Sequence, residues 1–320
     1  MQNTANLPGV QAVAEIVDKP LTSILKERCQ RGWLIITVLL VLLLGAMAAG
    51  IVLGAVKVAL PDLLQILGLW PGRTGLLEPT TRAIVLELRL PRVFLAAMVG
   101  AALAIAGTIF QALFLNPMAD PYVLGVSAGA ALGATIAFLF PARYLPLGVS
   151  LVPVAAFIGA ILTVILVCRL ARTGDYTSLP NMLLSGIAVG AFLTALVSLL
   201  MYFSRRHLQQ VVFWLMGGFD RANWPYVRLA LPYFALGYTV ALIQARALNV
   251  LLLGEETAAN LGVEVERTKK WLLVGASLLT ATAVAVSGPI GFVGLLVPHA
   301  LRLLVGPDHR LLLPASALGG

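Results

Sequence analysis

Few residues in this sequence have types and spacing suited to chemistry. The three histidines, His207, His299 and His309, share no spacing typical of metal ligands. We expect His299, beside the inner end of an apolar run, to be a hydrogen-bonded structural residue. No G-x-x-x-x-G-K-S/T run is present, so the chain cannot bind nucleotide phosphates through a P-loop. We therefore expect no catalytic residue, metal or cofactor in this chain, which is not predicted to be an enzyme.

Carboxylates are scarce inside the apolar runs. Asp120 and Asp175 lie in predicted turns, and hardly any other acid lies within a predicted span. Proton relays in transporters use membrane-buried carboxylates, so their scarcity counts against an ion-coupled secondary transporter, which stays the alternative class. A third hypothesis is a purely structural membrane subunit. Cys29 and Cys168 lie in different segments, and we expect two small buried hydrophobic side chains and no disulfide.

Two arginines form the first charged cluster. Arg89 and Arg92 flank Pro91, a residue type suited to the first turn of a helix. Arginines at a helix end commonly extend their charge to the membrane interface, and composition alone favours that role here.

Two glutamates form the second charged cluster. Glu255 and Glu256 suit the N-terminus of a short helix at 254–261, because negative charge is favourable there. Gly262 lies where a helix stop is expected. From spacing alone, a solvated cytosolic loop is favoured over a docking helix.

Long apolar runs must position these residues. Of 320 residues, 60% are apolar and 11% are charged, against about 45–50% and about 25% in soluble domains. The run from Trp33 to Val56 carries no charge in 24 positions, enough for a helix to cross a bilayer. Alternating segments typical of an outer-membrane barrel are scarce. The net charge of +8 comes from basic residues between the runs, without the aromatic interleaving of a nucleic-acid surface.

The sequence therefore predicts an all-α polytopic bundle. Residues 1-32 form a basic tail that we place in the cytoplasm, and residues 33-320 form the transmembrane domain. We expect a ninth span to open near Leu311 and to be cut off at Gly320. The eight whole spans are expected near 33-56, 92-115, 122-141, 146-168, 181-203, 225-244, 271-287 and 290-305.

Two long loops connect these spans. The stretch from Lys57 to Leu90 is expected outside, with a short surface helix from Leu60 to Leu69. The stretch 246-270 is expected inside, with a helical pattern of its own.

Prolines and glycines mark where the helices pack closely or break. Residues 116–121 predict a tight, ordered turn between two spans. Small residues at four-residue intervals, Gly125, Gly129 and Gly133, indicate tight packing within one bundle. The segment 288–299 predicts a kinked or broken pair of short helices near a translocation path, because freed backbone groups need protein or water around them. The residues that carry this last prediction are Gly288, Gly291, Gly294 and Pro298.

An ordered set of motifs from about residue 80 to the end of the chain closely resembles the FecCD family. That family comprises permease subunits of type II ABC importers for iron-siderophores, haem and cobalamin. The motifs are Leu88 to Arg92, Val99 to Gly107, Phe110 to Leu113, Asn116 to Pro121, Leu124 to Gly129, Leu184 to Ala188, Trp214 to Phe219, Leu253 to Val263, Gly288 to His299 and Asp308 to Pro314.

The resemblance implies a multi-pass protein of the inner (plasma) membrane, in contact with lipid. It implies a homodimer with the path at the two-fold axis, two ATP-binding subunits that use ATP and Mg, and a periplasmic or lipid-anchored substrate-binding protein. Family members have ten spans, so we expect this sequence to be truncated within the ninth and not to transport as written. No nucleic-acid partner is expected.

The resemblance also assigns roles to residues. Arg89 and Arg92 match arginines that receive acidic residues of the binding protein in cobalamin-importing relatives. A Thr-Ser gate pair of those relatives corresponds to Leu179 and Pro180, beside Ser178 and Asn181, and this departure counts against cobalamin as the substrate. The segment that contacts the nucleotide-binding subunit in the family corresponds to Gly254, Glu255, Glu256, Thr257, Ala258, Ala259, Asn260, Leu261 and Gly262.

Overall fold

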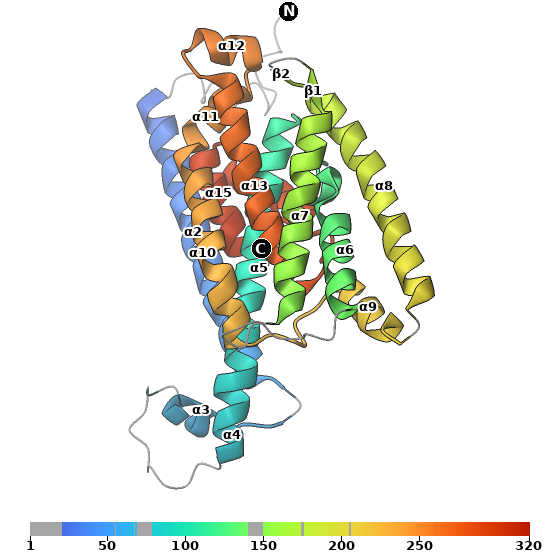
Figure 1. Ribbon diagram of the computed structural model, residues 1–320. Coiled ribbons are helices and arrows are strands. Elements are labelled where there is room, and N and C mark those ends of the chain that lie inside the picture. Colours follow the sequence, from blue (N-terminus) through green and yellow to red (C-terminus); the bar gives the residue numbers. More distant parts are fainter. Residues whose placement is uncertain are drawn as a thin grey trace, which may run out of the picture.

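The computed structural model describes residues 21–54, 56–66, 68, 79–139, 150–173, 176–204 and 206–320, which form a bundle of helices (Figure 1). Short helices cap both ends. α12 lies at one end and α3 and α4 lie at the other, and these ends are called the α12 end and the α3 end. The elements are α2 (Leu21–Val52), α3 (Leu60–Ile66), α4 (Pro79–Ala83), η1 (Ile84–Arg89), α5 (Leu90–Leu113), η2 (Pro121–Leu124), α6 (Val126–Leu139), α7 (Leu151–Leu170), β1 (Arg172–Thr173), β2 (Tyr176–Thr177), α8 (Leu179–Phe203), α9 (Leu208–Leu215), α10 (Trp224–Ile243), α11 (Ala245–Leu251), α12 (Glu255–Asn260), α13 (Val265–Ser287), α14 (Val293–Val305) and α15 (His309–Gly319).

The first helix begins earlier than predicted. α2 begins at Leu21, within the segment 1-32 that the sequence assigned to a tail, although only Gln30–Val52 is apolar enough to span a membrane. Lys, Arg and Glu are good helix formers, so the helix continues past the apolar run into charged sequence. Residues 1–20 of the predicted tail lie outside the described residues.

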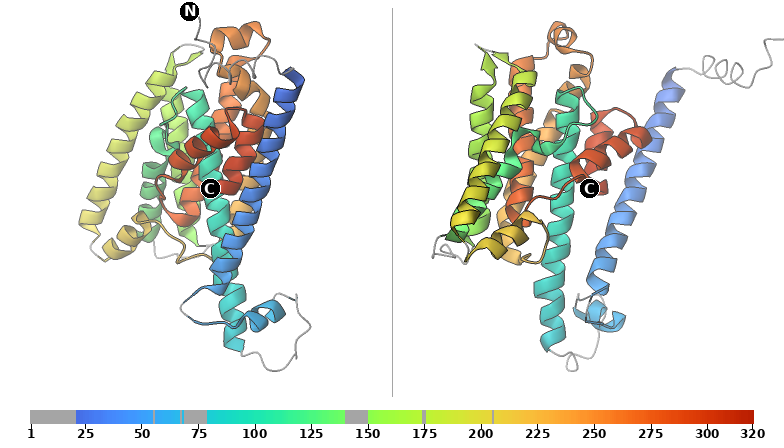
Figure 2. Two further views of the ribbon diagram at one scale, coloured as in Figure 1. Left: turned by 180° about the vertical axis from the view of Figure 1, so that it is seen from behind. Right: turned by 90° about the vertical axis from the view of Figure 1, so that its right-hand side faces the viewer.

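Two long helices form the centre of the bundle. The helix that runs from Pro79 through η1 to Leu113 and the helix α13 are the most buried of the candidate spans, and they pack against each other. α14 and α15 lie between α5 and α2 (Figure 2). Most side chains of α2 and α8 face away from the bundle. These outer helices leave apolar surface for lipid or for another protein.

Six helices, and not the eight expected, are long and apolar enough to cross a membrane within the described residues. α6 and α14 have 14 and 13 residues and are too short. Both helices begin later than the predicted spans. η2 and Gly125 take up the start of the span predicted at 122-141, and the irregular segment from Gly288 to Phe292 takes up the start of the span predicted at 290-305. The surface helix predicted at 60–69 is present as α3, which is described as far as Ile66.

Pro91 does not begin a helix, as its residue type had suggested. It lies inside the continuous helix 79–113, directly after the π-helical turn Ile84–Arg89. Proline removes one backbone hydrogen bond and crowds the preceding turn. A π-helical turn widens the backbone there, so the helix can pass the proline without ending.

The glycine stripe packs α6 tightly against α7, as predicted. A side-chain carbon added to Gly133 would collide with the carbonyl oxygen of Ala155, and one added to Gly129 would collide with the hydroxyl of Thr163. Small residues let membrane helices approach closely and gain dispersion energy. The prediction of packing within one chain is confirmed.

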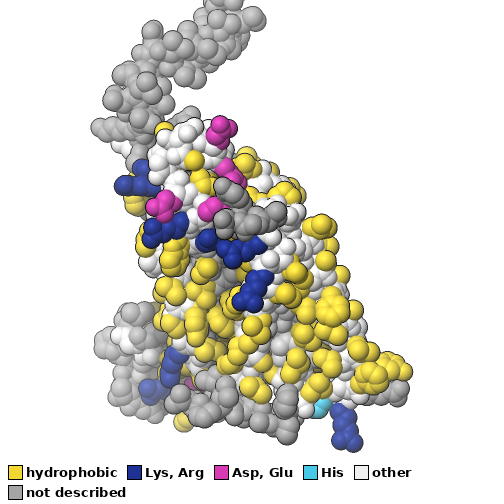
Figure 3. All heavy atoms as spheres, turned by 45° about the horizontal axis from the view of Figure 1, so that its top comes forward, with side chains coloured by type: hydrophobic (Ala, Val, Ile, Leu, Met, Phe, Trp, Pro, Cys, Tyr) yellow, Lys and Arg dark blue, Asp and Glu magenta, His cyan; other side chains and the backbone are white. Residues whose placement is uncertain are grey.

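Charge is concentrated at the ends of the bundle. Seen with the α12 end turned toward the viewer, acidic and basic side chains gather around that end, and the flank below is mainly hydrophobic (Figure 3). The two-residue strands β1 and β2 form a small antiparallel hairpin near the same end, between α7 and α8. This distribution fits a multi-pass membrane protein.

Candidate functional site

The predicted short helix exists as α12 and projects from the bundle. Gly254 and Gly262 bound it with φ angles of 98° and 84°, a region that residues with side chains rarely adopt. Ala258 is fully buried, whereas Glu255, Glu256, Thr257, Ala259 and Asn260 are exposed. The prediction of a helix with a stop at Gly262 is confirmed. Apart from the buried Ala258, α12 presents an exposed surface suited to contact with another protein.

A buried lysine joins α12 to the bundle. Nζ of Lys269, in the first turns of α13, lies 2.5 Å from Oε2 of Glu255 and 3.4 Å from Oε1 of Glu266. The lysine side chain is 5% exposed, and the carboxylate side chains are 53% and 27% exposed. A buried ammonium group needs such partners, because burial of an unpaired charge is costly.

The predicted gate segment meets this ion pair. A cavity of about 240 Å³ is lined by Glu255 and Lys269, by Leu179 and Pro180 at the start of α8, and by the end of α5. Ser178 caps α8, since its hydroxyl accepts a hydrogen bond from the backbone N–H of Asn181 at 3.4 Å. The structure thus brings together two segments about 75 residues apart that the sequence had singled out separately.

The short helix η2, which follows the irregular segment 114–120, contacts the irregular segment 288–292 and the start of α14. The hydroxyl of Tyr122 donates to the carbonyl oxygen of Ile290 at 3.0 Å and accepts from the N–H of Ile290 at 3.1 Å. Gly294 is buried against Pro121 and the carbonyl oxygen of Leu103. Backbone groups freed by a break inside a membrane protein need such internal partners.

The broken helix predicted at 288–299 is present, with its break at 288–292. Gly288 ends α13, Gly291 lies exposed in the break, and Gly294 and Pro298 are buried in α14. α14 continues through Pro298, so the chain breaks once in this segment.

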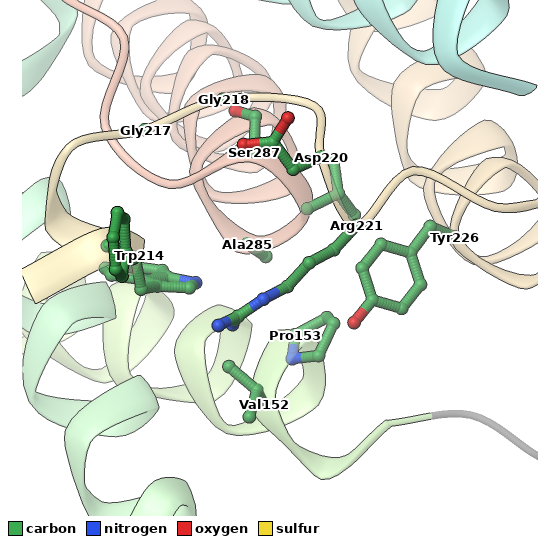
Figure 4. A pocket seen from close by; sticks show the side chains of 12 residues that line it. Val152, Pro153, Trp214, Gly217, Gly218, Asp220, Arg221, Tyr226, Ala285 and Ser287 are labelled. Carbon is green, nitrogen blue, oxygen red and sulfur yellow. The ribbon is translucent and has the colours of Figure 1, made fainter. Parts of the chain in front are cut away.

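At the α3 end, the loop after α9 packs on the end of α13. The N–H of Gly218 donates to the carbonyl oxygen of Ser287 at 2.7 Å. Beside this contact lies a cavity of about 210 Å³, into which Arg221 points between Trp214 and Pro153 (Figure 4). The guanidinium carbon of Arg221 also lies 5.3 Å from the ring centre of Phe138, a cation–π distance.

Arg89 is buried at the end of α2. Its Nη1 donates to the carbonyl oxygens of Ile51 and Val52 at 2.8 and 3.0 Å, and its Nη2 donates to that of Val56. The last carbonyls of a helix have no partners within the helix, and a cation there is favourable. The resemblance assigns Arg89 a docking role, which stays a prediction; in the structure its guanidinium contacts the end of α2.

Arg92 lies one turn further along the helix and is exposed. Its Nε donates to the carbonyl oxygen of Phe219 at 3.2 Å. The indole N–H of Trp224 donates to the carbonyl oxygen of Leu86 at 2.8 Å, within the π-helical turn. The loop and helix start at 219–224 are therefore fastened to the helix that carries both arginines.

The histidines are not grouped. Within the described residues, no group of three or more His, Cys, Asp or Glu side chains is placed to hold a metal. His309, at the start of α15, lies 2.8 Å from Oδ1 of Asn249 through Nδ1. Burial, and then the nearby charge of Arg302, lower the pKa of His309 to about 4, so its ring is neutral.

Sequence reasoning missed Lys269, Tyr122 and Trp224. Lys269 stood among several basic residues of a loop segment, and nothing in its spacing indicated burial. Tyr122 and Trp224 do carry a signal, because each lies beside a proline at a helix start, where backbone groups without partners are expected.

The sequence matches the FecCD transport family over residues 38–320. It is 49% identical over 241 residues to a cobalamin import system permease protein, BtuC, of Halobacterium salinarum, a match that covers 75% of this chain and 64% of that protein. It is 45% identical over 239 residues to the hemin transport system permease protein HmuU of Yersinia pestis, which covers 74% and 71% of the two chains.

A solved structure has the same fold. It is described as an inward-facing conformation of a metal-chelate type ABC transporter, and it superposes with a TM-score of 0.74 at 32% identity. The match covers 88% of this chain and 84% of the other.

Proposed function

Because the chain belongs to the FecCD transport family, we propose that it is the permease subunit of an ATP-driven ABC importer that carries an iron chelate, haem or a corrinoid across the inner membrane. The observation that carries the proposal is the cavity shared by Glu255 and Lys269 with Leu179 and Pro180. At this cavity the start of α8, whose apolar side chains are largely exposed, lies directly beside α12, which projects from the bundle and is suited to contact with another protein.

The proposed assembly is a homodimer with two ATP-binding subunits. Each ATPase binds α12 on the cytoplasmic side, where ATP and Mg are used by the partner and not by this chain. The substrate path follows the two-fold axis, with α8 beside it. The outward-facing side chains of α8 support this, because large apolar residues such as Leu184, Ile187 and Phe192 are exposed along it.

A periplasmic or lipid-anchored binding protein is proposed to dock at the α3 end. Arg92 is the better placed of the two arginines, because its side chain is exposed and the guanidinium of Arg89 is already hydrogen-bonded. Charge-assisted pairs with acidic side chains are strong and directional. Arg92→Glu should weaken docking of the binding protein to the assembled complex, and unchanged docking would remove this part of the proposal.

The test of the importer is uptake in vesicles. The full-length protein, its ATPase and its binding protein are reconstituted in proteoliposomes, and uptake of labelled substrate is measured with and without ATP. Uptake that requires ATP supports the proposal. Uptake driven by an ion gradient without ATP would instead identify the alternative, a secondary transporter.

The substrate is identified through the binding protein. Large amphipathic chelates offer few polar groups to an apolar path, so selection is expected before the permease. Titration of the cognate binding protein with ferric siderophores, haem and cobalamin separates the three classes proposed. The relatives named for cobalamin and hemin are both close in sequence, which is why a direct titration decides more than a further comparison.

A further inference from the structure

We propose that Lys269 is a positioning residue that transmits movement of α12 to α13 and to the start of α8. The inference rests on the proposed function, since it assigns a coupling role within the same importer. It goes beyond a docking surface, because Lys269 is buried and lies beneath the surface that another protein can touch.

Within the described residues, few interactions hold α12 in place. Gly254 and Gly262 flank it in unusual backbone conformations, and no described atom outside their immediate neighbours lies within 4 Å of the position of a side chain at either glycine. Ala258 is the buried residue of the helix. Among the described residues, the Glu255 to Lys269 ion pair is thus the polar side-chain contact that ties the first turn of α12 to α13. A helix held in this way can tilt as a unit, and the ion pair determines how much of that movement the bundle receives.

Lys269 has a second acceptor that stays with it. Glu266 lies three residues earlier on α13, so its carboxylate moves together with Lys269. When α12 is displaced and Glu255 withdraws, Glu266 still compensates the buried ammonium. Removal of the last partner of a buried charge is strongly unfavourable, so this arrangement allows the α12 contact to break at low cost.

From Lys269, movement reaches both the predicted gate and the far end of the bundle. The same cavity is lined by Leu179 and Pro180, so a shift of Glu255 or Lys269 changes the packing beside the start of α8. α13 is a single buried helix that ends at Ser287, where Gly218 and the break at 288–292 contact it. A displacement at one end of this rigid element is therefore felt at the segments around Tyr122 and Ile290.

The test is the number of ATP molecules hydrolysed for each substrate molecule imported, measured with the full-length complex in proteoliposomes. Lys269→Met keeps the apolar stem and removes the charge, and the carboxylates it leaves behind remain in contact with water. We expect the complex to assemble and hydrolyse ATP, while import per ATP falls about tenfold, within the usual range of coupling free energies. Lys269→Arg should restore most of the coupling, because it returns the charge.

The matched control is Arg267→Gln. Arg267 lies on the same helix and pairs at 3.2 Å with Glu264, the residue that directly precedes α13, with the same three-residue spacing, but both side chains are about 70% exposed. This variant should import as much per ATP as the unmodified complex. A purely structural role for Lys269 predicts loss of assembly and of ATP hydrolysis together, and that result would overturn the proposal.

A second variant keeps the test valid if Lys269→Met fails to fold. Glu255→Gln breaks the same pair at a half-exposed side chain and should also lower import per ATP. If both Lys269→Met and Glu255→Gln import with unchanged efficiency, the coupling role is wrong. Failure of the proposed function looks different, because the unmodified complex would then show no ATP-driven uptake at all.

Discussion

Each end of the bundle contains a buried cation, and the two are held in different ways. Arg89, at the α3 end, donates to three backbone carbonyl groups at and just beyond the end of α2. Lys269, at the α12 end, pairs with the side chains of Glu255 and Glu266, one on another helix and one on its own. The two acceptors within α2 cannot leave without unwinding that helix, whereas side-chain acceptors can exchange. The comparison indicates that Arg89 fastens the α3 end, and that the contact of Lys269 can be exchanged, as the coupling proposal requires.

The largest effect on stability is expected from Arg89→Met. Loss of three hydrogen bonds from a charged group should destabilise the α3 end by about 3 kcal/mol. Hydrogen exchange of residues 58–66 should rise, because α3 packs there in a small cluster with Val85. Arg92→Met is the control, since Arg92 is exposed and makes one long hydrogen bond. Equal effects of the two variants would contradict the view that Arg89 is the fastening.

Tyr122→Phe probes the interior between the two ends. It removes both hydrogen bonds to Ile290, and we expect a loss of about 2 kcal/mol in the free energy of unfolding. The backbone N–H of Ile290 should then exchange faster. Tyr238→Phe serves as the control, because the described residues give its hydroxyl no hydrogen bond. If the Ile290 amide is equally protected in both variants, the junction does not depend on Tyr122.

Lys269→Met should have a smaller effect on stability, about 1 kcal/mol, because its partners stay partly solvated. Thermal unfolding of the detergent-solubilised protein measures it. A loss as large as that of Arg89→Met would remove the difference between the two ends, since it would make the Lys269 contact a fastening too.

The smallest effect is expected from Glu264→Gln. Its pair with Arg267 is exposed on both sides, and such pairs contribute less than about 0.5 kcal/mol. The same thermal unfolding experiment should therefore show no resolvable change. A clear loss would mean that exposure at the α12 end is a poor guide to the strength of its ion pairs.

Local features of the fold could be predicted from the sequence and long-range ones could not. The short helix at 255–260 and its stop at Gly262 follow from acidic residues and a glycine close together in the chain. The tight packing along Gly129 and Gly133 follows from spacing as well. The breaks at 114–120 and 288–292 were predicted from prolines and glycines, but the apolar runs around them were still counted as full spans. Hydropathy measures how apolar a segment is and not where its backbone bends.

The roles of the charged residues needed the structure for a related reason. Arg89 finds its acceptors 33 to 38 residues away, and Glu255 finds its partner across the turn at Gly262. The sequence lists the charged residues, but only the fold determines which hydrogen-bond acceptor or opposite charge each of them contacts. Residue types did not indicate that Arg89 contacts the end of α2, whereas Arg92 has the exposed position that a docking role requires.

The π-helical turn at Ile84–Arg89 also fixes the helical phase of everything before it. One additional residue in a turn rotates the preceding side chains by about 100° relative to an uninterrupted α-helix. Within this turn, Leu86 offers its carbonyl oxygen to Trp224. Deletion of a single residue from this turn would therefore turn the whole of α4 to another side, so the segment tolerates substitutions better than changes of length.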